Sequence, residues 1–248
     1  MAAPSEAHRA RRHPISRWYV GPAAARFARR LAASRVRPAH LTLAGLVAAA
    51  TAATIMFVWP TAGPWAALAV LAAWFFDRAD GQLARLQGTA SAWGAWLDAN
   101  VDELVDVGLH VAVAAAAARL TGGQWPWFLL VAFLAGKYLF FRGLAIPESS
   151  ATPNSVESRA CGERGIGDSS VATQAWPWHP SRDNPDESSG LLRRCYHLPG
   201  NTDVRVHLLL VALVTGYLTT ELALVAAYYN LRWIARYALV ARRLGGSP

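Results

Sequence analysis

The sequence predicts an all-α integral membrane protein with six transmembrane helices and an amphipathic juxtamembrane helix on their N-terminal side. Of the 248 residues, 54% are hydrophobic and 16% are charged, whereas about a quarter of the residues in soluble domains are charged. Six apolar stretches are long enough, or nearly so, to cross about 30 Å of hydrocarbon as helices. Arginines gather before the first stretch and after the last. These observations favour a bilayer over water as the solvent.

The first region, residues 1–39, is a basic tail that leads into the juxtamembrane helix. Between Ser16 and Val36, basic residues alternate with apolar and aromatic ones. A helix of this composition can lie in the anionic headgroup layer and use both of its faces there. An ordinary basic tail beside the membrane is the alternative that this composition leaves open.

The apolar stretches fall into two groups, four in the region 40–146 and two in the region 204–248, which ends in a basic tail. The last two are short, and we expect a tight turn at Thr219–Glu221 to join them. An even number of spans puts both basic termini on one side, which the positive-inside rule makes the cytoplasmic side of a multi-pass protein of the cell membrane. The predicted spans lie near residues 40–60, 64–86, 92–119, 125–146, 204–220 and 221–241.

Residues 147–203 interrupt the apolar pattern and are rich in Ser, Pro, Gly, Asn and charge, which predicts a flexible cytoplasmic loop. Its two cysteines, Cys161 and Cys195, lack the spacing of a zinc site. A stable disulfide is not expected between them in the cytoplasm.

The formal net charge of +8 raises nucleic acid as a partner. The arginines, however, gather at the two ends of the apolar region, and aromatic residues do not form a platform with them as in nucleic-acid binding proteins. Membrane lipids, and not nucleic acid, are therefore the expected partners.

The residues that carry chemistry lie in the segment FFDRADGQLARLQGTASAWGAWLDANVDELVD, residues 75–106. Asp77 and Asp80 are three residues apart, so both carboxylates share one face of the second predicted span. Gly81 and Ala84 fall on that same face and leave it nearly bare. A large ligand such as a nucleotide can therefore approach the backbone there.

A short turn leads to the third predicted span, where Gly94, Asp98 and Asp102 follow at intervals of four and form one stripe. Two helices joined by so short a turn can bring all four carboxylates together. An ionised aspartate at the middle of a bilayer costs about 3 kcal/mol, and mutual repulsion adds to this cost. The cluster therefore requires a cation.

Oxygen ligands favour Mg²⁺ or Mn²⁺ over zinc, and four carboxylates suit two ions better than one. Such a two-ion site can neutralise a pyrophosphate and stabilise an in-line displacement at phosphorus. The alternative is a solvated charge face balanced by Arg78 and Arg85. Arg78 lies off the face of Asp77 and Asp80, which disfavours that alternative.

The spacing of these residues resembles the signature of the class I CDP-alcohol phosphatidyltransferases, D-x2-D-G-x2-A-R-x8-G-x3-D-x3-D. Every fixed position of the signature is matched, by Asp77, Asp80, Gly81, Ala84, Arg85, Gly94, Asp98 and Asp102.

The resemblance implies a six-helix membrane fold whose active site opens to the cytoplasm, and a role in phospholipid biosynthesis. It implies that an acceptor hydroxyl attacks the β-phosphorus of a CDP-alcohol, with CDP-diacylglycerol as the expected donor and CMP as the product. The aspartates of the signature would be the metal ligands, and Asp102 would also be the catalytic general base.

The same resemblance implies contacts to the donor. Gly81, Arg85 and Ser91 fall where members of the family contact the cytidine diphosphate. The segment from Arg37 to Thr42 is similar to the family's approach to the first span, which makes His40 and Thr42 further donor-binding candidates. Ala39 stands where the family has a polar residue after the proline.

Three basic residues in or beside the predicted spans are candidates for binding the acceptor: Lys137, Arg142 and Arg205. They could hold a phosphorylated alcohol such as inositol phosphate or glycerol phosphate. Snorkelling of these side chains to lipid headgroups is the alternative.

Four polar residues near these candidates carry weaker predictions. Asp106 continues the stripe of Asp102 and can support the metal ligands from behind. Glu103 is expected to face another helix or the interface. Asp203 is expected at the start of the fifth span, where it could complete the pocket, and either Asn201 or Thr202 could be the N-cap there.

Two other functions compete with a CDP-alcohol transferase. A membrane prenyltransferase also binds a diphosphate with paired aspartates and Mg²⁺, but here a single hairpin carries all four aspartates. A catalytically inert multispan transporter or scaffold is the second alternative, although transporters more often show two related halves. A homodimer is compatible with the sequence.

Overall fold

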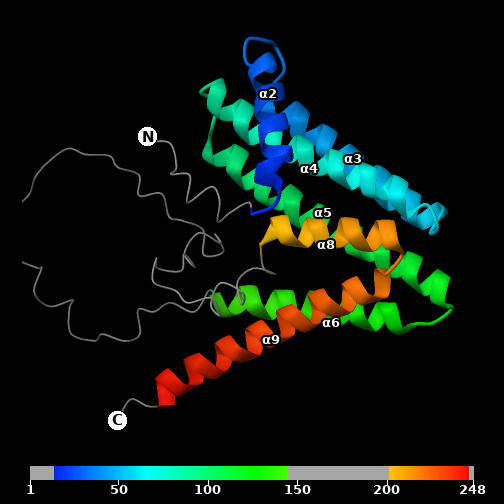
Figure 1. Cartoon of the computed structure of the whole chain (residues 1–248). Helices are drawn as coiled ribbons and strands as arrows, with labels where there is room; N and C mark the ends of the chain where they lie inside the picture. The colour runs from blue at the N-terminus through cyan, green and yellow to red at the C-terminus, as the bar shows by residue number, and fades with distance from the viewer. Residues whose placement is uncertain (1–13, 145–200, 246–248) are drawn as a thin grey trace, which may run out of the picture.

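The computed structural model describes residues 14–144 and 201–245, and all regular secondary structure in these two segments is helical (Figure 1). The predicted all-α class is thereby confirmed for the described part of the chain. Most of the predicted loop 147–203, with Cys161 and Cys195, lies outside the described residues. The elements are the 3₁₀-helix η1 (Ser16–Trp18) and the α-helices α2 (Val20–Leu31), α3 (Pro38–Val58), α4 (Gly63–Leu86), α5 (Ala92–Thr121), α6 (Trp125–Leu144), α8 (Thr202–Thr215) and α9 (Leu218–Gly245).

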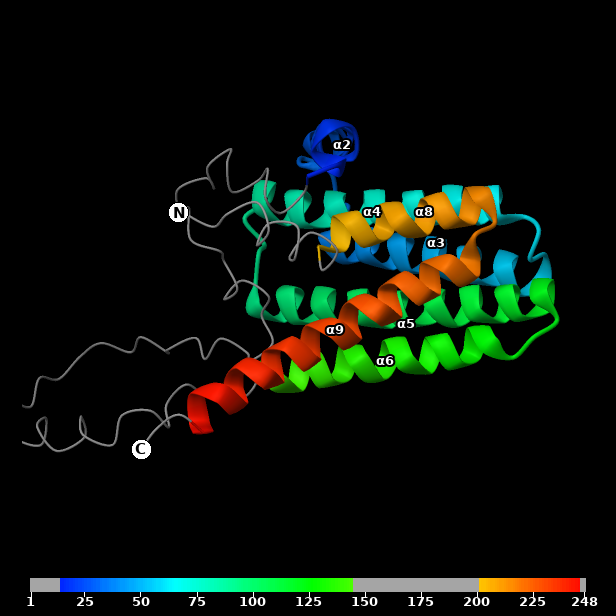
Figure 2. The same cartoon turned by 60° about the horizontal axis from the view of Figure 1, so that its bottom comes forward.

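The helices from α3 to α9 run roughly side by side in alternating directions (Figure 2). The tip of the α4–α5 hairpin, the end of α6 and the start of α8 therefore lie at one end of the bundle. The short helix α2 lies across α4 at that same end (Figures 1 and 2). The residues that the sequence predicts to carry the chemistry therefore lie toward this end of the bundle.

Within residues 14–144 and 201–245, two helices are long and apolar enough to cross a membrane by length and composition: α3, with a mean hydropathy of 2.1, and α5, with 1.5. The set of six predicted spans is thus not confirmed by this criterion. With 14 residues, α8 is about 21 Å long at 1.5 Å per residue, which is less than the hydrocarbon core of a bilayer.

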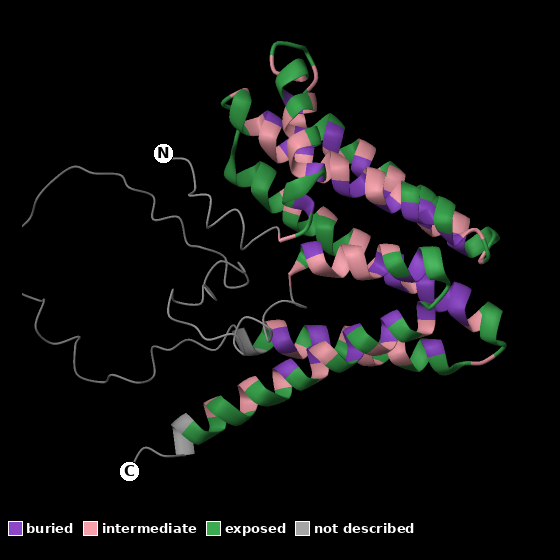
Figure 3. Ribbon diagram, in the orientation of Figure 1, coloured by how far each residue is buried: buried purple, intermediate pink, exposed green. Residues whose placement is uncertain are grey.

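Many large apolar residues are nevertheless exposed along the helices. Figure 3 shows where the exposed positions lie on each helix. So many exposed large apolar residues are unusual for a protein surrounded by water. Among the exposed residues are Leu43, Val47, Trp65, Leu68, Leu104, Phe128, Val131, Val211, Leu224 and Leu231.

The juxtamembrane helix that the sequence predicts is present as α2, but its apolar face is covered by protein. Ala24 and Ala28 are fully buried and pack with Ala79 and Leu83 of α4. The exposed residues of η1 and α2 include Arg17, Arg26, Arg29 and Arg30. A helix lying in the headgroup layer was expected to place both faces there, whereas the apolar face of α2 packs against α4.

The turn between the last two helices lies earlier than predicted. The tight turn expected at Thr219–Glu221 is wrong, because those residues form the first turn of α9. Gly216 ends α8 instead, with a φ of 81°. Only glycine adopts this left-handed conformation without a steric penalty, so Gly216 was the signal in the sequence.

The start of α4 approaches α8 so closely that only glycine fits. A Cβ added to Gly63 would overlap the carbonyl oxygen of Leu213 on α8. We expect Gly63→Ala to lower the free energy of unfolding by about 1–3 kcal/mol, since one of the two helices must move. Thermal unfolding in detergent measures this loss.

The matched control is Gly108→Ala on α5, where an added Cβ meets nothing within 4 Å. Alanine is the better helix former, so this change should stabilise by about 0.5–1 kcal/mol. Equal melting temperatures for the two variants would contradict the close contact between α4 and α8.

Candidate active site

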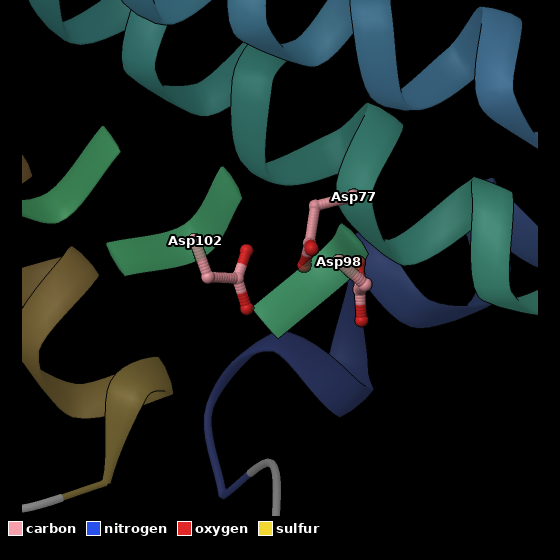
Figure 4. Close-up of side chains that lie close together, drawn as sticks. All are labelled: Asp77, Asp98 and Asp102. Atoms are coloured by element: carbon pink, nitrogen blue, oxygen red, sulfur yellow. The ribbon is translucent and has the colours of Figure 1, made fainter. Parts of the chain in front are cut away.

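Three carboxylates meet across the α4–α5 hairpin. Asp77 lies in the second half of α4, and Asp98 and Asp102 lie in the first half of α5. One carboxylate oxygen of each residue can be chosen so that all three lie within 4.8 Å of one another. Figure 4 shows Asp77 and Asp102 pointing toward each other from the two helices, with Asp98 beside them.

The start of α5 fixes the register of this stripe. Ser91 is the N-cap of the helix, and its Oγ accepts a hydrogen bond of 3.1 Å from the backbone N–H of Gly94. A Cβ on Gly94 would lie 3.3 Å from that Oγ, so a glycine here leaves room for the cap. The Ser91 hydroxyl, predicted to contact the donor, thus also begins the helix that carries Asp98 and Asp102.

The fourth aspartate, Asp80, lies outside this trio. Its side chain is buried, with 5% of its surface exposed. Oδ2 accepts a hydrogen bond of 2.6 Å from Oγ1 of Thr42 on α3. Thr42, a predicted donor contact, therefore holds Asp80 in the structure and links α3 to α4.

No lysine or arginine within residues 14–144 and 201–245 forms an ion pair with Asp77, Asp98 or Asp102. Arg78 instead packs over the ring of Trp74, with 5.9 Å from Cζ to the ring centroid. The sequence left open a charge face balanced by Arg78 and Arg85, and neither arginine forms an ion pair with the three carboxylates. Three carboxylates without an ion-pair partner on membrane-type helices are an arrangement that a cation would stabilise.

The geometry of the trio fits a hard divalent cation. Mg²⁺ takes oxygen ligands at about 2.0–2.1 Å, so opposite ligands of one ion lie about 4 Å apart. One oxygen of each carboxylate lies within 4.8 Å of the other two, so a small side-chain adjustment would bring all three to one ion. Asp77, Asp98 and Asp102 are therefore the residues that could hold a metal ion.

The donor-side candidates Gly81, Arg85 and His40 lie near the ends of α4 and α3. A Cβ on Gly81 would lie 3.6 Å from Nη1 of Arg85, so the exposed guanidinium group sits beside the bare backbone of Gly81. His40 is exposed at the start of α3, where its Nδ1 accepts a hydrogen bond of 3.3 Å from the backbone N–H of Arg37. Arg85 is thus placed to bind an anionic group near the hairpin.

Two of the three acceptor candidates converge on Asp106. The carboxylate of Asp106 accepts hydrogen bonds from Nζ of Lys137 on α6 and from Nη2 of Arg205 on α8. Nζ of Lys137 also lies 2.8 Å from Oε1 of Glu103, so Glu103 faces another helix as expected. Arg142 is exposed near the end of α6 and forms no ion pair with any described residue.

Sequence reasoning missed three residues that complete this buried cluster. His110, one turn beyond Asp106, lies 3.2 Å through Nε2 from Oε1 of Glu221 on α9. Tyr229, also on α9, accepts a hydrogen bond from Nη1 of Arg205 through its hydroxyl. The signal was present, because an ionisable residue such as His110 or Glu221 within an apolar span is rarely without a role.

The start of α8 binds the N-terminal segment. Of the two predicted N-cap candidates, Asn201 and not Thr202 caps the helix, since its Oδ1 accepts a hydrogen bond of 2.9 Å from the N–H of Asp203. The fully buried carboxylate of Asp203 accepts hydrogen bonds from the N–H groups of Ile15, at 2.7 Å, and Ser16, at 3.1 Å. Asp203 thus fastens η1 to α8 and lies outside the cluster of Asp77, Asp98 and Asp102.

A hydroxyl–imidazole contact strengthens this attachment. His207 uses Nδ1 for the carbonyl oxygen of Asp203, so Nε2 is available to accept from the hydroxyl of Tyr19. Partial burial, followed by the charge of Asp203, raises the pKa of Tyr19 above its ordinary value. Tyr19 therefore remains the neutral donor at physiological pH.

In the part of the chain that the structure describes, apolar helices carry a cation-sized carboxylate cluster, which is a feature of metal-dependent membrane enzymes. The model of the CDP-alcohol phosphatidyltransferase family matches residues 35–156, a range that contains α3 to α6 and the whole hairpin. This segment belongs to the CDP-alcohol phosphatidyltransferase family. A search of curated proteins found no match.

Membership confirms the resemblance seen in the aspartate signature. The family supports a general phosphotransferase activity that takes a CDP-alcohol as donor and a hydroxyl group as acceptor, and it uses a divalent metal. The trio of aspartates could hold such a metal. Together with the two apolar helices, the family indicates a membrane location.

The hydrogen bond between Thr42 and Asp80 can be tested by its effect on stability. Thr42→Val keeps the shape of the side chain but leaves Oδ2 of the buried Asp80 without this donor. We expect a loss of about 1–3 kcal/mol in the free energy of unfolding, because a buried acceptor loses its partner.

Thr42→Ser retains a hydroxyl and is the control, with an expected loss of less than about 1 kcal/mol. Thermal unfolding of the two variants side by side makes the comparison. If the valine variant were as stable as the serine variant, the hydrogen bond would contribute nothing.

Proposed function

We propose that this protein transfers a phosphate-linked alcohol, specifically a phosphatidyl group, from a CDP-alcohol to an acceptor hydroxyl and releases CMP. One observation carries the proposal: Asp77, Asp98 and Asp102 converge from the two helices of one hairpin without a basic partner among the described residues. The family match over residues 35–156 supplies the class of donor and acceptor. CDP-diacylglycerol is the proposed donor, which places the reaction in phospholipid biosynthesis.

The proposed metal ligands are Asp77, Asp80, Asp98 and Asp102. When bound there, Mg²⁺ or Mn²⁺, in our proposal as two ions, neutralises the pyrophosphate of the donor and stabilises the negative charge that develops at phosphorus. The role of Thr42 is to orient Asp80, since its hydroxyl donates to that carboxylate. Asp80 is buried beside α3 and thus complements the more accessible Asp98 and Asp102.

Other residues at this end of the bundle bind the donor, and Asp102 accepts one proton. Arg85 binds a phosphate oxygen of the donor, next to the bare backbone of Gly81, while Ser91 and His40 lie at the adjoining helix starts. The acceptor oxygen forms a bond to the β-phosphorus as the bond from that phosphorus to the oxygen of CMP breaks. Asp102 receives the proton of the acceptor hydroxyl, and CMP leaves with the electron pair.

On the acceptor side we propose a phosphorylated alcohol, such as inositol phosphate or glycerol phosphate. Lys137 and Arg205 both point inward to Asp106, one turn along α5 from Asp102. This inward direction argues against snorkelling to lipid headgroups for these two side chains. Lys137 also pairs with Glu103, which is about half exposed, so an acceptor phosphate would replace Glu103 as the partner of Lys137. Arg142, which is exposed near the end of α6, is the third proposed contact.

We further propose that the six helices from α3 to α9 lie in the cell membrane, with the active site and both termini on the cytoplasmic side. Their alternating directions bring the hairpin tip, the end of α6 and the start of α8 to one end. The basic surface of α2 lies at that end, where the positive-inside rule places the cytoplasm. The apolar exterior of the helices suits contact with lipid.

The competing functions are less well supported. A membrane prenyltransferase would not account for the family match. An inert scaffold would have no reason to keep all four aspartates of the signature together with a cluster of cation-binding size. The transferase explains both observations.

The reaction itself is tested by CMP release from CDP-diacylglycerol in the presence of a panel of acceptors: inositol phosphate, glycerol phosphate, serine and inositol. We expect release that requires Mg²⁺ or Mn²⁺ and stops on addition of EDTA. Asp102→Asn should lower kcat by a factor of about 100 or more, since it removes a carboxylate that holds the metal and takes the proton.

Asn100→Ala is the matched control, because Asn100 is an exposed residue between Asp98 and Asp102 on the same helix. It should keep the activity of the wild type. Equal CMP release from wild type and Asp102→Asn, or full activity in EDTA, would show that the assignment is wrong.

The class of acceptor is tested by Lys137→Met, which removes the charge of a buried lysine while keeping its length. We expect the KM for inositol phosphate or glycerol phosphate to rise by at least about tenfold, because one charge-assisted contact to phosphate is lost. The KM for CDP-diacylglycerol should stay within about twofold of the wild type. Loss of rate with unphosphorylated acceptors alone would speak for a different acceptor.

A further inference from the structure

His110 and Glu221 form a buried polar pair that the proposed reaction does not use directly. Their exposed fractions are 3% and 1%, and the pair joins α5 to the first turn of α9. Nδ1 of His110 lies 2.7 Å from the backbone carbonyl oxygen of Asp106, and Nε2 lies 3.2 Å from Oε1 of Glu221. Both ring nitrogens are thus engaged, so the imidazole has a single orientation.

The hydrogen bonds determine how many protons the pair holds. A carbonyl oxygen only accepts, so Nδ1 of His110 must carry a hydrogen. Nε2 then either accepts from a protonated Glu221 or donates to an ionised one. In both cases the pair shares one proton, keeps its hydrogen bond and has no net charge, which is the form that burial tolerates best.

Stability alone does not explain such a pair. Buried ion pairs can often be replaced by apolar residues of similar volume without loss of stability. On one side the centroid of the Phe133 ring lies 4.5 Å from that of His110, and on the other side Nδ1 of His110 lies 3.5 Å from Oδ1 of Asp106. Oε2 of Glu221 is buried without a hydrogen-bond partner among the described residues. Because a hydrogen bond is directional, the pair fixes the rotation of α9 relative to α5, which an apolar contact would not do.

The orientation of α9 relative to α5 affects the residues proposed to bind the acceptor. Asp106 is joined to the pair through its carbonyl oxygen, and its carboxylate holds Lys137 and Arg205. The second anchor of Arg205 is the hydroxyl of Tyr229, two turns along α9 from Glu221. A shift or rotation of α9 against α5 would therefore move Tyr229 away from Arg205.

We propose that His110 and Glu221 are positioning residues for the acceptor: they hold α9 against α5 so that Asp106 and Tyr229 keep Lys137 and Arg205 in the orientation that binds the acceptor's anionic group. This inference rests on the proposed transferase function. It assigns to His110 and Glu221 no contact with either substrate.

The test compares an apolar replacement of the pair with the wild type in detergent, using CDP-diacylglycerol as donor and inositol phosphate and glycerol phosphate as acceptors. The double variant His110→Leu/Glu221→Leu should melt at or above the wild-type temperature. Its KM for the phosphorylated acceptor should rise about tenfold, while the KM for CDP-diacylglycerol stays within about twofold.

Three further variants separate positioning from simple packing. Glu221→Gln can donate from its amide to Nε2 of a neutral His110, so it should restore the acceptor KM to within about threefold of wild type. Tyr229→Phe should raise the acceptor KM, and its combination with Glu221→Leu should be less than additive, because both act through Arg205. Leu222→Ala disturbs the packing of the same turn of α9 and should lower the melting temperature without this selective change in the acceptor KM.

If the double variant folds and keeps the wild-type KM for the acceptor, the inference is wrong. It is also wrong if the double variant raises the KM for the acceptor and the KM for CDP-diacylglycerol equally and Leu222→Ala has the same effect. If the double variant did not fold, Glu221→Leu and Glu221→Gln would be compared instead. The inference then requires a higher acceptor KM in Glu221→Leu than in Glu221→Gln, and equal values would overturn it. Absence of CMP release by the wild-type protein with every acceptor would instead remove the proposed function, and the inference with it.

Discussion

The mutual repulsion of Asp77, Asp98 and Asp102 is the constraint on which the rest of this structure depends. Their carboxylate oxygens lie within 4.8 Å of one another, on helices whose other side chains are largely apolar. Like charges at this distance interact strongly wherever water is scarce. The arrangement persists as a folded state because the two helices are held together by contacts elsewhere, and it becomes favourable when a divalent cation is bound.

Those contacts come from both sides of the hairpin. α3 packs against both α4 and α5, the two helices that carry the aspartates, and α2 packs against α4. The hydrogen bond from Thr42 to Asp80 adds a polar link between α3 and α4. On the other side α6 and α9 pack together and contact α5. The positions of α4 and α5 are thus determined by their neighbours, and with them the positions of the aspartates.

The two charged regions of the molecule are organised in opposite ways. The trio at the hairpin has carboxylates and no described basic partner, which is suited to an exchangeable metal and the phosphates that it binds. One turn farther along α5, Asp106 is saturated by Lys137 and Arg205, and these in turn contact Glu103 and Tyr229. A metal bound by the trio would supply the positive charge for a pyrophosphate, whereas an acceptor phosphate would have to exchange with a carboxylate partner of Lys137 or Arg205.

By itself the sequence determined the helical class, the hairpin and the stripe of aspartates. These features depend on residues three or four apart, and helical periodicity places such residues on one face whatever the rest of the chain does. The partners of those residues were decided by tertiary structure alone. Thr42 lies 38 residues from Asp80, Arg205 lies 99 from Asp106, and Glu221 lies 111 from His110. Contacts over such separations depend on how the helices pack and rotate, and no local pattern in a single sequence specifies that rotation.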